Sequence, residues 1–309
     1  MYFSSKNKAL RPGSQDKYST VMNCISARLS RIAVQYTTNS HRAKISSNMS
    51  KTRKRMPSYR PWGSTEDGRI EFESLTDETL EGALKVLRES FFINESVSKA
   101  VDINLEPGAS EELEELCLNA AKDGVSVVAI DITSNEVVGV SFNKIQVSDS
   151  STEKSYFERF SDDCQYKSSK ALVDFMIDID SRINLFKHYN VNCILEIMFL
   201  ATHPAYEKRR IGELLVTSSL ELGKELRRGK NVRTPVTIHG SDDLSNADKI
   251  PTLASAIMTS NYSQRIATKL HFDQLIEVSY DDFEFNGKKY SEKINKVHQK
   301  CVLVAKRLA

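Results

Sequence analysis

The segment that most clearly predicts a ligand site is a short basic turn between an apolar run and a helix. Residues 197–216 read IMFLATHPAYEKRRIGELLV. A helix N-terminus offers free backbone N–H groups and the positive end of the helix dipole, so such a turn predicts an anion site. Lys208, Arg209 and Arg210 add three positive charges there, and Gly212 allows a ligand to approach the backbone. A solvated basic turn is the alternative interpretation.

A glutamate that follows two aromatic residues is a candidate general base. Glu95 lies just after Phe91 and Phe92. Apolar rings beside a carboxylate raise its pKa, which suits a group that must accept a proton near neutral pH. An ordinary exposed glutamate at a helix end is the alternative interpretation.

The elements that would position these residues belong to a chain of 309 residues with an uneven charge distribution. Residues 1–60 hold six Lys and seven Arg against one acidic residue, whereas 61–309 hold 30 basic and 40 acidic residues. The shares of 40% hydrophobic and 27% charged residues exclude a wholly disordered, collagen-like or coiled-coil chain. The sequence therefore predicts a basic Ser- and Arg-rich arm over 1–68, too poor in apolar residues to fold, and a folded domain over 69–309.

From Arg69 onward, strand and helix patterns alternate, which predicts a single α/β domain. The run 193–201 (CILEIMFLA) is the most apolar in the chain and predicts a central strand. Residues 145–167 have no clear period and predict a long loop. Further strands are expected over 69–75, 125–132, 137–144, 254–258, 275–280 and 300–305, and helices after caps at 76–77 and 110 and over 168–187, 211–228 and 261–270.

Several short segments carry a resemblance to a known family. They are FFINE at 91–95, LATHPAYEKRRIG at 200–212, TSNYS at 259–263, KLHF at 269–272 and HQKCVLVAK at 298–306. In this order and spacing the chain resembles the GCN5-related N-acetyltransferases (GNAT), and among them it is most similar to insect arylalkylamine N-acetyltransferases. The resemblance covers residues 69–308. It implies the GNAT fold, an α/β (α+β) domain with a central mixed, mostly antiparallel sheet and helices on both faces.

The resemblance implies acetyl-CoA as co-substrate and a loop that wraps its pyrophosphate. The family's loop has the pattern Gln/Arg-x-x-Gly-x-Gly/Ala, of which this chain keeps Gly212 and replaces the first two positions by Glu207 and Arg210. In a later helix His271 replaces the glycine of the family's Gly-Phe ending. The strand that ends near Ala201 would offer backbone N–H groups to the thioester carbonyl. The residues expected to bind the coenzyme are Leu200, Ala201, Thr202, Lys208, Arg209, Arg210, Ile211, Gly212 and Glu213.

The resemblance also implies catalytic residues. In the insect enzymes a glutamate within Phe-Phe-x-Asp-Glu-Pro-Leu is assigned as the base that deprotonates the amine, and Glu95 matches it although two of its neighbours differ. Many related acetyltransferases protonate the leaving thiolate with a tyrosine, but the matching residue here is Ala267. The hydroxyl groups of Ser263, and then Ser260, are therefore the candidates, with helix capping as their alternative role.

These features together predict an acetyl-CoA-dependent N-acetyltransferase that acts on small amines by direct transfer in a ternary complex. Arylalkylamines such as dopamine, serotonin, tyramine and octopamine are the expected substrates, while polyamines and other small amines stay open. The acidic body suits a cationic substrate. Two alternatives remain: a catalytically weakened GNAT-fold binding or regulatory protein with a degenerate coenzyme loop, and a nucleic-acid-associated protein that acts through the basic residues 42–60.

The sequence also bears on compartment and partners. Five widely spaced cysteines without a CxxC pair favour a reducing compartment, and no metal site is expected. The chain has no apolar run long enough to cross a bilayer, so no membrane partner is expected. We also expect a cytoplasmic location, a monomer and no nucleic-acid partner. The arm leaves two other interpretations open: a mitochondrial transit peptide, because Arg28 and Arg31 alternate with apolar residues, or sequence ahead of a start at Met49.

Overall fold

An eight-stranded sheet runs through the part of the chain that this computed structural model describes, residues 61–148 and 154–309. The predicted arm up to residue 60 lies outside the described residues. Two short strands, β8 (Glu284–Phe285) and β9 (Lys288–Lys289), pair separately as a hairpin. The strands of the large sheet are β1 (Gly63–Ser64), β2 (Ile70–Ser74), β3 (Val127–Asp131), β4 (Glu136–Val147), β5 (Cys193–Thr202), β6 (Leu253–Met258), β7 (Asp273–Ser279) and β10 (Lys300–Arg307).

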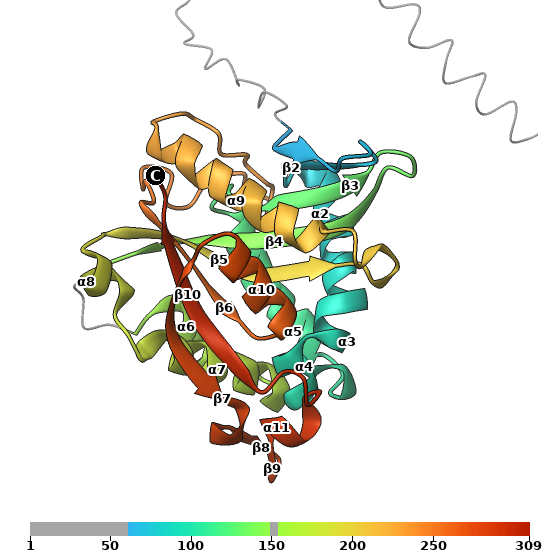
Figure 1. The fold of residues 1–309 in the computed structure, drawn as a ribbon, viewed down its shortest axis with the longest axis vertical. Coiled ribbons are helices and arrows are strands. Elements are labelled where there is room, and N and C mark those ends of the chain that lie inside the picture. Colours follow the sequence, from blue (N-terminus) through green and yellow to red (C-terminus); the bar gives the residue numbers. More distant parts are fainter. Residues whose placement is uncertain (1–60, 149–153) are drawn as a thin grey trace, which may run out of the picture. The chain divides into compact units, whose positions relative to one another are not determined.

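The strands follow the order β1-β2-β3-β4-β5-β6-β10-β7 across the sheet (Figure 1). Within the described residues, every neighbouring pair is antiparallel except β5 and β6, which run parallel. The long helix α9 (Ile211–Arg227) lies between β5 and β6 in the chain and provides the crossover that a parallel pair needs. The sheet is therefore mixed and mostly antiparallel, which confirms the predicted fold class.

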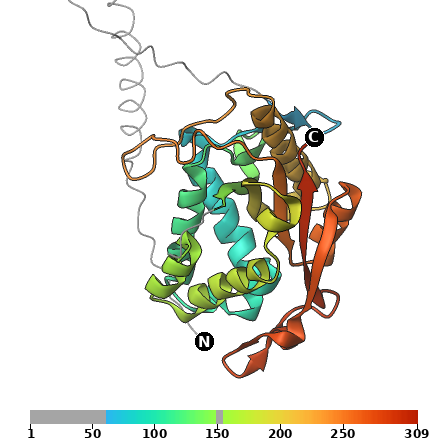
Figure 2. The same cartoon turned by 90° about the vertical axis from the view of Figure 1, so that its left-hand side faces the viewer.

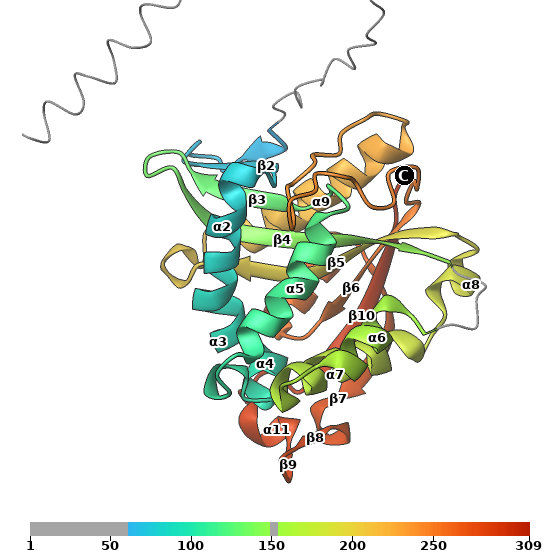
Figure 3. The ribbon, with the colours of Figure 1, turned by 180° about the vertical axis from the view of Figure 1, so that it is seen from behind.

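Helices cover both faces of the sheet. Figure 1 shows α9 and α10 in front of the strands, and Figures 2 and 3 show α2, α5 and α7 gathered on the opposite face. The α-helices are α2 (Asp77–Val86), α3 (Phe92–Asn94), α4 (Ser96–Ala100), α5 (Ala109–Ala121), α6 (Tyr156–Asp163), α7 (Lys167–Ser181), α8 (Leu185–Tyr189), α9, α10 (Asn261–Lys269) and α11 (Tyr290–Lys293). η1 (Leu87–Phe91) is a π-helical turn, and η2 (Ile103–Leu105), η3 (Pro204–Tyr206) and η4 (Tyr280–Asp282) are 3₁₀ turns.

Alternation along the strands divides the core into two clusters. In β3, Val128 and Ile130 pack in the cluster that holds Leu113 of α5, whereas Val127 and Ala129 pack in the cluster that holds Leu215 of α9. Successive side chains of a strand point to opposite faces, so a strand covered on both sides is apolar throughout. This explains why β3 and β5 read as continuous apolar runs in the sequence.

The parallel pair at the centre of the sheet separates partway along its length. The β5–β6 register runs from Ile194–Leu253 to Ile197–Ala256 and then stops, although β5 continues to Thr202 alongside β4. Opposite β4 the register shifts between Ile197 and Phe199, so Met198 forms a bulge there. Beyond this bulge β5 and β6 diverge, and the sheet opens where the functional site lies.

The segment 145–167 differs from the sequence prediction. Residues 145–167 were expected to form a long loop, but the end of β4 and the whole of α6 lie within this range. Ser155 caps α6 by accepting a hydrogen bond from the N–H of Glu158, and the Glu158 carboxylate accepts one from the N–H of Ser155. The aromatic side chains of Tyr156 and Phe160 pack against the core. The helix was missed because its apolar stripe, Tyr156, Phe157 and Phe160, is short and is surrounded by polar residues.

Candidate active site

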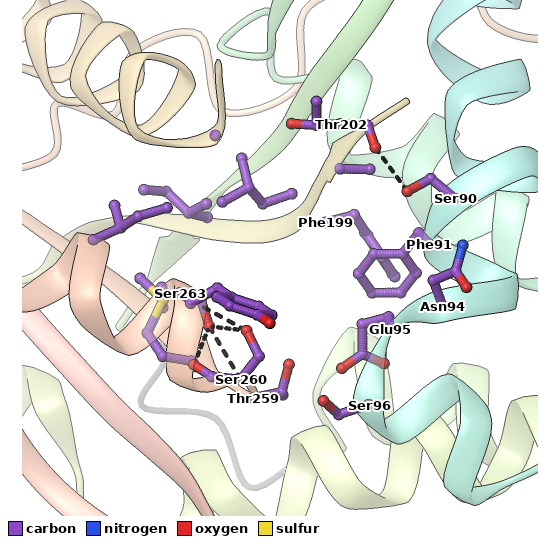
Figure 4. A pocket seen from close by; sticks show the side chains of 18 of the residues that line it. Ser90, Phe91, Asn94, Glu95, Ser96, Phe199, Thr202, Thr259, Ser260 and Ser263 are labelled. Atoms are coloured by element: carbon purple, nitrogen blue, oxygen red, sulfur yellow. Dashed lines mark hydrogen bonds between the residues drawn. The ribbon is translucent and has the colours of Figure 1, made fainter. Parts of the chain in front are cut away.

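A cavity of about 620 Å³ occupies the place where β5 and β6 separate. Its walls come from both faces of the sheet: α4 and α7 on one, and the N-terminus of α9 with α10 on the other. The diverging ends of β5 and β6 line the middle, from Ile197 to Thr202 and from Ala256 to Ser260. Figure 4 shows Glu95, Phe91 and Phe199 on the wall opposite Ser260 and Ser263. The cavity therefore passes through the sheet.

The N-terminus of α9 forms one end of the cavity. Leu214 N–H donates to Arg210 C=O at 3.0 Å, so the N–H groups of the first turn, ahead of Leu214, have no acceptor within the helix. A Cβ added to Gly212 would lie 3.5 Å from Ile266 Cδ1, an ordinary contact, so protein packing alone does not require glycine there. Free donors and an open backbone make this end suitable for an anion, as predicted.

The three cations of the basic turn take different positions. Lys208 and Arg210 line the cavity, whereas the Arg209 guanidinium lies over the Tyr206 ring, 4.8 Å from its centre, and does not line it. Arg210 donates to Glu213 at 2.7 Å, and Lys269 also contacts Glu213, at 2.8 Å. The Arg210 side chain holds the pKa of Glu213 below its usual range. Two of the three predicted cations thus face the cavity.

Arg210 and His271, which replace glycines of the family pattern, both have a left-handed backbone conformation. Arg210 occupies the position where the resemblance expects a glycine, and its backbone adopts the left-handed conformation that glycine favours, with φ 63°. His271, the other replaced glycine, likewise has φ 57° just after α10. Both replacements keep the backbone path that glycine would give, at some cost in strain.

The end of β5 supplies an open strand edge to the cavity. Leu200, Ala201 and Thr202 line it, and they pair with β4 on one side only, because β6 has already diverged. Backbone groups on the other edge therefore have no neighbouring strand. The Thr202 carbonyl accepts a hydrogen bond from Ser90 Oγ at 2.8 Å, which fixes the strand end against the turn that leads to Glu95 (Figure 4).

Glu95 lies between α3 and α4 and caps α4. The π-helical turn η1 leads into α3, which ends at Asn94. Glu95 then has an extended backbone, with φ −62° and ψ 147°. Glu95 Oε2 accepts the N–H of Ser98 at 2.7 Å. Glu95 Oε1 is buried and has no hydrogen-bond partner among the described residues, and it belongs to a side chain that lines the cavity. One carboxylate oxygen is thus fixed and the other is free to accept a proton.

Aromatic rings surround the approach to Glu95. Phe91 packs edge-on against Phe199 of β5, with 5.3 Å between ring centres, and also against Phe92 at 5.8 Å. Phe91 and Phe199 both line the cavity. These rings form an apolar wall beside the carboxylate.

Ser260 and Ser263 both line the cavity, but they also cap α10. Ser260 Oγ accepts the N–H of Ser263 at 3.1 Å, and Ser263 Oγ accepts the N–H of Ser260 at 3.2 Å. Ser263 Oγ lies 3.0 Å from the carbonyl of Ser260, to which it donates. The capping role that the sequence offered as an alternative is therefore present, and a donor role stays a prediction.

His298 also faces the cavity, and it was not among the predicted site residues. Its Nδ1 accepts the N–H of Asn261 at 3.1 Å, and its ring lies edge-on to Tyr262, 5.2 Å between centres. Burial lowers the pKa of His298, although the nearby carboxylate of Glu95 acts in the opposite direction. The available signal was its position at the start of HQKCVLVAK, one of the segments that carried the resemblance.

Two further observations concern the described residues as a whole. Between 61–148 and 154–309, no group of three or more His, Cys, Asp or Glu side chains is arranged to hold a metal ion. In the same ranges, no helix has both the length and the apolar character needed to cross a membrane.

Comparison with solved structures places this geometry among known enzymes. Arylalkylamine N-acetyltransferase 2 from Aedes aegypti has 26% sequence identity, covers 78% of this chain and 99% of its own, and superimposes with a TM-score of 0.62. The mosquito arylalkylamine N-acetyltransferase like 5b has 16% identity, 77% and 99% coverage and a TM-score of 0.56. The polyamine N-acetyltransferase of Drosophila melanogaster that forms N-acetylagmatine has 14% identity, 77% and 99% coverage and a TM-score of 0.57.

No protein-family model matches the sequence, and no curated protein matches it. The structural comparison nevertheless confirms the predicted resemblance to insect arylalkylamine N-acetyltransferases. It also confirms the GNAT fold and the acyltransferase class of the chain.

Proposed function

We propose that this acyltransferase of the GNAT fold transfers an acetyl group from acetyl-CoA to a small primary amine, with arylalkylamines such as dopamine, serotonin, tyramine and octopamine as the substrate class. One observation carries the proposal. A single cavity runs through the opened sheet with free helix N–H groups and cations at one end and the unpaired Glu95 Oε1 at the other. Such a cavity offers a separate end to each substrate, which suits direct transfer in a ternary complex.

The coenzyme end would bind acetyl-CoA through backbone groups. The N–H groups of Ile211, Gly212 and Glu213 at the start of α9 would receive the pyrophosphate, with Lys208 and Arg210 beside it. The open edge of β5 from Leu200 to Thr202 would align the acyl-bearing arm and offer N–H groups to the thioester carbonyl. Arg209, which packs on Tyr206, would act by fixing the turn.

The amine end supplies the proton acceptor. An alkylamine has a pKa near that of Lys, about 10, so it arrives protonated and must lose a proton before it can attack. Glu95 Oε1 takes that proton, directly or through water, and the neutral nitrogen attacks the acetyl carbon. The C–N bond forms as the C–S bond breaks, and the second proton of the nitrogen passes to the departing thiolate, which leaves as the thiol. Ser263, with Ser260, would donate toward the departing sulfur.

Two measurements test this proposal. Calorimetric titration of the purified protein with acetyl-CoA should show binding at micromolar strength, and acetyl transfer should be detected with members of an amine panel. Absence of binding up to millimolar acetyl-CoA would favour the alternative of a weakened GNAT-fold binding protein. Binding without transfer to any amine would contradict the proposed reaction while preserving the coenzyme site.

We place this activity in the cytoplasm, with a mitochondrial location through the basic arm as the alternative. The cysteines of the described residues, Cys117, Cys164, Cys193 and Cys301, are free, as suits a reducing compartment. A fluorescent fusion of the whole chain, compared with one that lacks residues 1–60, tests the location directly. A mitochondrial signal that disappears on deletion of the arm would support the alternative.

A further inference from the structure

Besides Glu95 and the two glutamates near the start of α9, Glu207 and Glu213, a buried carboxylate of β5 lines the cavity. Glu196 of β5 is only 5% exposed and lines the cavity just where β5 and β6 begin to separate. Its Oε2 accepts a hydrogen bond from Gln146 Nε2 at 2.6 Å, and no bond to its Oε1 is found among the described residues. A carboxylate buried in an apolar wall is costly unless a partner compensates its charge. Glu196 thus has one oxygen held by Gln146, and its side chain lines the cavity, where a ligand can donate to it.

The position of Glu196 on its strand places it on the face of α7. Ile194, two residues earlier, packs in the same cluster as Leu172 and Phe175 of α7, whereas Leu195 packs in the cluster of α9. Because side chains alternate along a strand, Glu196 shares the face of Ile194. It lies in the amine half of the cavity, on the same side of the sheet as α4 and α7.

Another carboxyl group, on α7, interacts with Glu196. Asp180 follows Leu172 and Met176 along α7 at four-residue steps, and both of those residues line the cavity. Residues at such spacing share one helix face. Burial, and then the charge of Glu196, raise the pKa of Asp180 well above its usual range, and burial raises the pKa of Glu196. The two carboxyl groups thus repel each other when both are ionised.

The protein's own cations do not neutralise this pair. Lys144 lies near enough to favour the ionised form of Glu196, but its Nζ forms an ion pair with the fully buried Asp123 at 2.7 Å. Within residues 61–148 and 154–309, no Lys, Arg or His forms an ion pair with Glu196 or Asp180. A cation brought by a ligand would complete the arrangement.

The wall between the two acidic ends is apolar. Phe91 and Phe199 lie beside Glu95, and Phe175 and Met176 of α7 continue the lining. An alkyl chain that spans this wall would carry one amino group to Glu95 and place its far end at Glu196. A chain without a second charge would leave the buried carboxyl pair without a partner.

We propose that Glu196, with Asp180 next to it, binds the second positive charge of the amine substrate, so that the preferred substrates are dications: α,ω-diamines or guanidinoalkylamines. This inference rests on the proposed acetyl transfer, and among small primary amines it favours dications over the arylalkylamines. A phenol hydroxyl of an arylalkylamine also donates to a carboxylate, but it brings no charge to a pair that lacks a cation. The dication is therefore the better match.

The test compares two amines that differ in one charged group. Diaminopentane and pentylamine share the same chain, and tyramine represents the arylalkylamines. For the wild-type protein we expect kcat/KM for diaminopentane to exceed that for pentylamine by about 10–100-fold, the contribution of a charge-assisted hydrogen bond. Glu196→Gln keeps an oxygen for Gln146 and should remove this preference, mainly by raising KM for diaminopentane toward that for pentylamine.

Control variants separate this effect from a general loss of structure. Glu277→Gln removes an exposed carboxylate that pairs with Lys300 at the far side of the sheet, and it should leave every amine unaffected. Asp180→Asn should reduce the diamine preference in part, and thermal unfolding of each variant checks its folding. If Glu196→Gln does not fold, the Asp180→Asn result decides.

The outcomes that overturn the inference are distinct from failure of the proposed function. A wild-type preference for tyramine or pentylamine, or an equal loss for all amines in Glu196→Gln, would overturn it. If no amine is acetylated, calorimetry of diaminopentane and pentylamine with the wild-type and Glu196→Gln proteins still decides. Equal binding of both amines by both proteins would then overturn the subsite, and selective binding of the diamine by the wild type alone would support it.

Discussion

Ser90 Oγ donates a hydrogen bond to the carbonyl of Thr202 at 2.8 Å, and it thereby joins the turn that leads to Glu95 to the last residue of β5. The two elements belong to opposite ends of the proposed reaction: β5 would align the thioester, and Glu95 would take the proton. Their relative position depends on this contact between residues far apart in the chain. A π-helical turn, which widens the helix at η1, brings Ser90 to that position.

Ser90→Ala should lower kcat/KM for amines with a smaller effect on folding. Loss of one partly buried hydrogen bond should reduce the free energy of unfolding by about 1 kcal/mol. The displaced base should reduce turnover, because small misplacements of reacting groups slow catalysis strongly. Steady-state kinetics and urea unfolding measure the two effects. Ser181→Ala, which removes an exposed hydroxyl bond to Asp178, is the matched control and should change neither.

Glu95→Gln should abolish most of the activity at neutral pH. The amide still accepts the N–H of Ser98, so α4 keeps its cap, but it no longer takes a proton. We expect kcat/KM to fall about 10²–10⁴-fold, the contribution of general base catalysis, with unchanged acetyl-CoA affinity. Glu78→Gln on α2 serves as a control for the loss of one charge. Turnover equal to that of the wild type would exclude Glu95 as the base.

Gly212→Ala should separate coenzyme binding from stability. The added Cβ meets Ile266 at 3.5 Å, so the fold tolerates it, and alanine favours a helix more than glycine does. The methyl group would occupy space toward the cavity where the pyrophosphate is expected. We predict a melting temperature equal to or above that of the wild type and acetyl-CoA affinity lower by about tenfold, or 1.4 kcal/mol. Unchanged affinity would place the coenzyme elsewhere.

His271→Gly should stabilise the protein. His271 adopts a left-handed backbone with φ 57°, which costs a non-glycine residue about 1 kcal/mol, and its exposed side chain is not needed for the contact that its carbonyl accepts from Lys306. Urea unfolding should show a gain of up to about 1 kcal/mol. Asn190, with φ 51°, tolerates this conformation better, so Asn190→Gly should give less. A loss of stability in His271→Gly would contradict the strain argument.

His298 should make stability depend on pH. Because burial lowers its pKa in the folded state, the unfolded chain binds a proton at His298 more readily. Stability from this residue is present above the unfolded pKa, about 6.5, and is lost as pH falls below it. Replacement by Gln should make the decline between pH 7 and pH 5 shallower in urea titrations. His239→Gln, an exposed residue beside Glu115, is the control and should leave the decline as in the wild type.

Much of the fold could be predicted from the sequence because its signals are local. The apolar run 193–201 matches β5, and the cap at Thr76 matches the start of α2. The cap predicted at Ser110 was wrong: α5 begins one residue earlier, after Gly108, whose left-handed backbone turns the chain into the helix. The turn residue Gly108 and the predicted cap Ser110 are only two positions apart, so the sequence pattern does not distinguish which of them precedes the helix.

The site was predicted less completely because its residues meet only after folding. Glu95 and the start of α9 carry local motifs that made them candidates. His298 begins one of the segments of the resemblance but was not singled out, and Glu196 carries no motif. Glu196 reads as one polar residue in an apolar strand, and only the separation of β5 from β6 gives it a cavity to line. For Ser260 and Ser263 the sequence allowed either helix capping or donation to the leaving thiolate, and their hydrogen bonds show that they cap α10.

The separation of β5 from β6 has a consequence for how the protein can change over time. The elements expected to hold the coenzyme, α9 and α10, lie on one face of the sheet, and those expected to hold the amine, α4 and α7, lie on the other. Substitutions on α7 therefore alter one wall without disturbing the packing of α9. If the proposed function holds, replacements on α7 would change the preference for the amine while the binding of the acetyl donor stays the same.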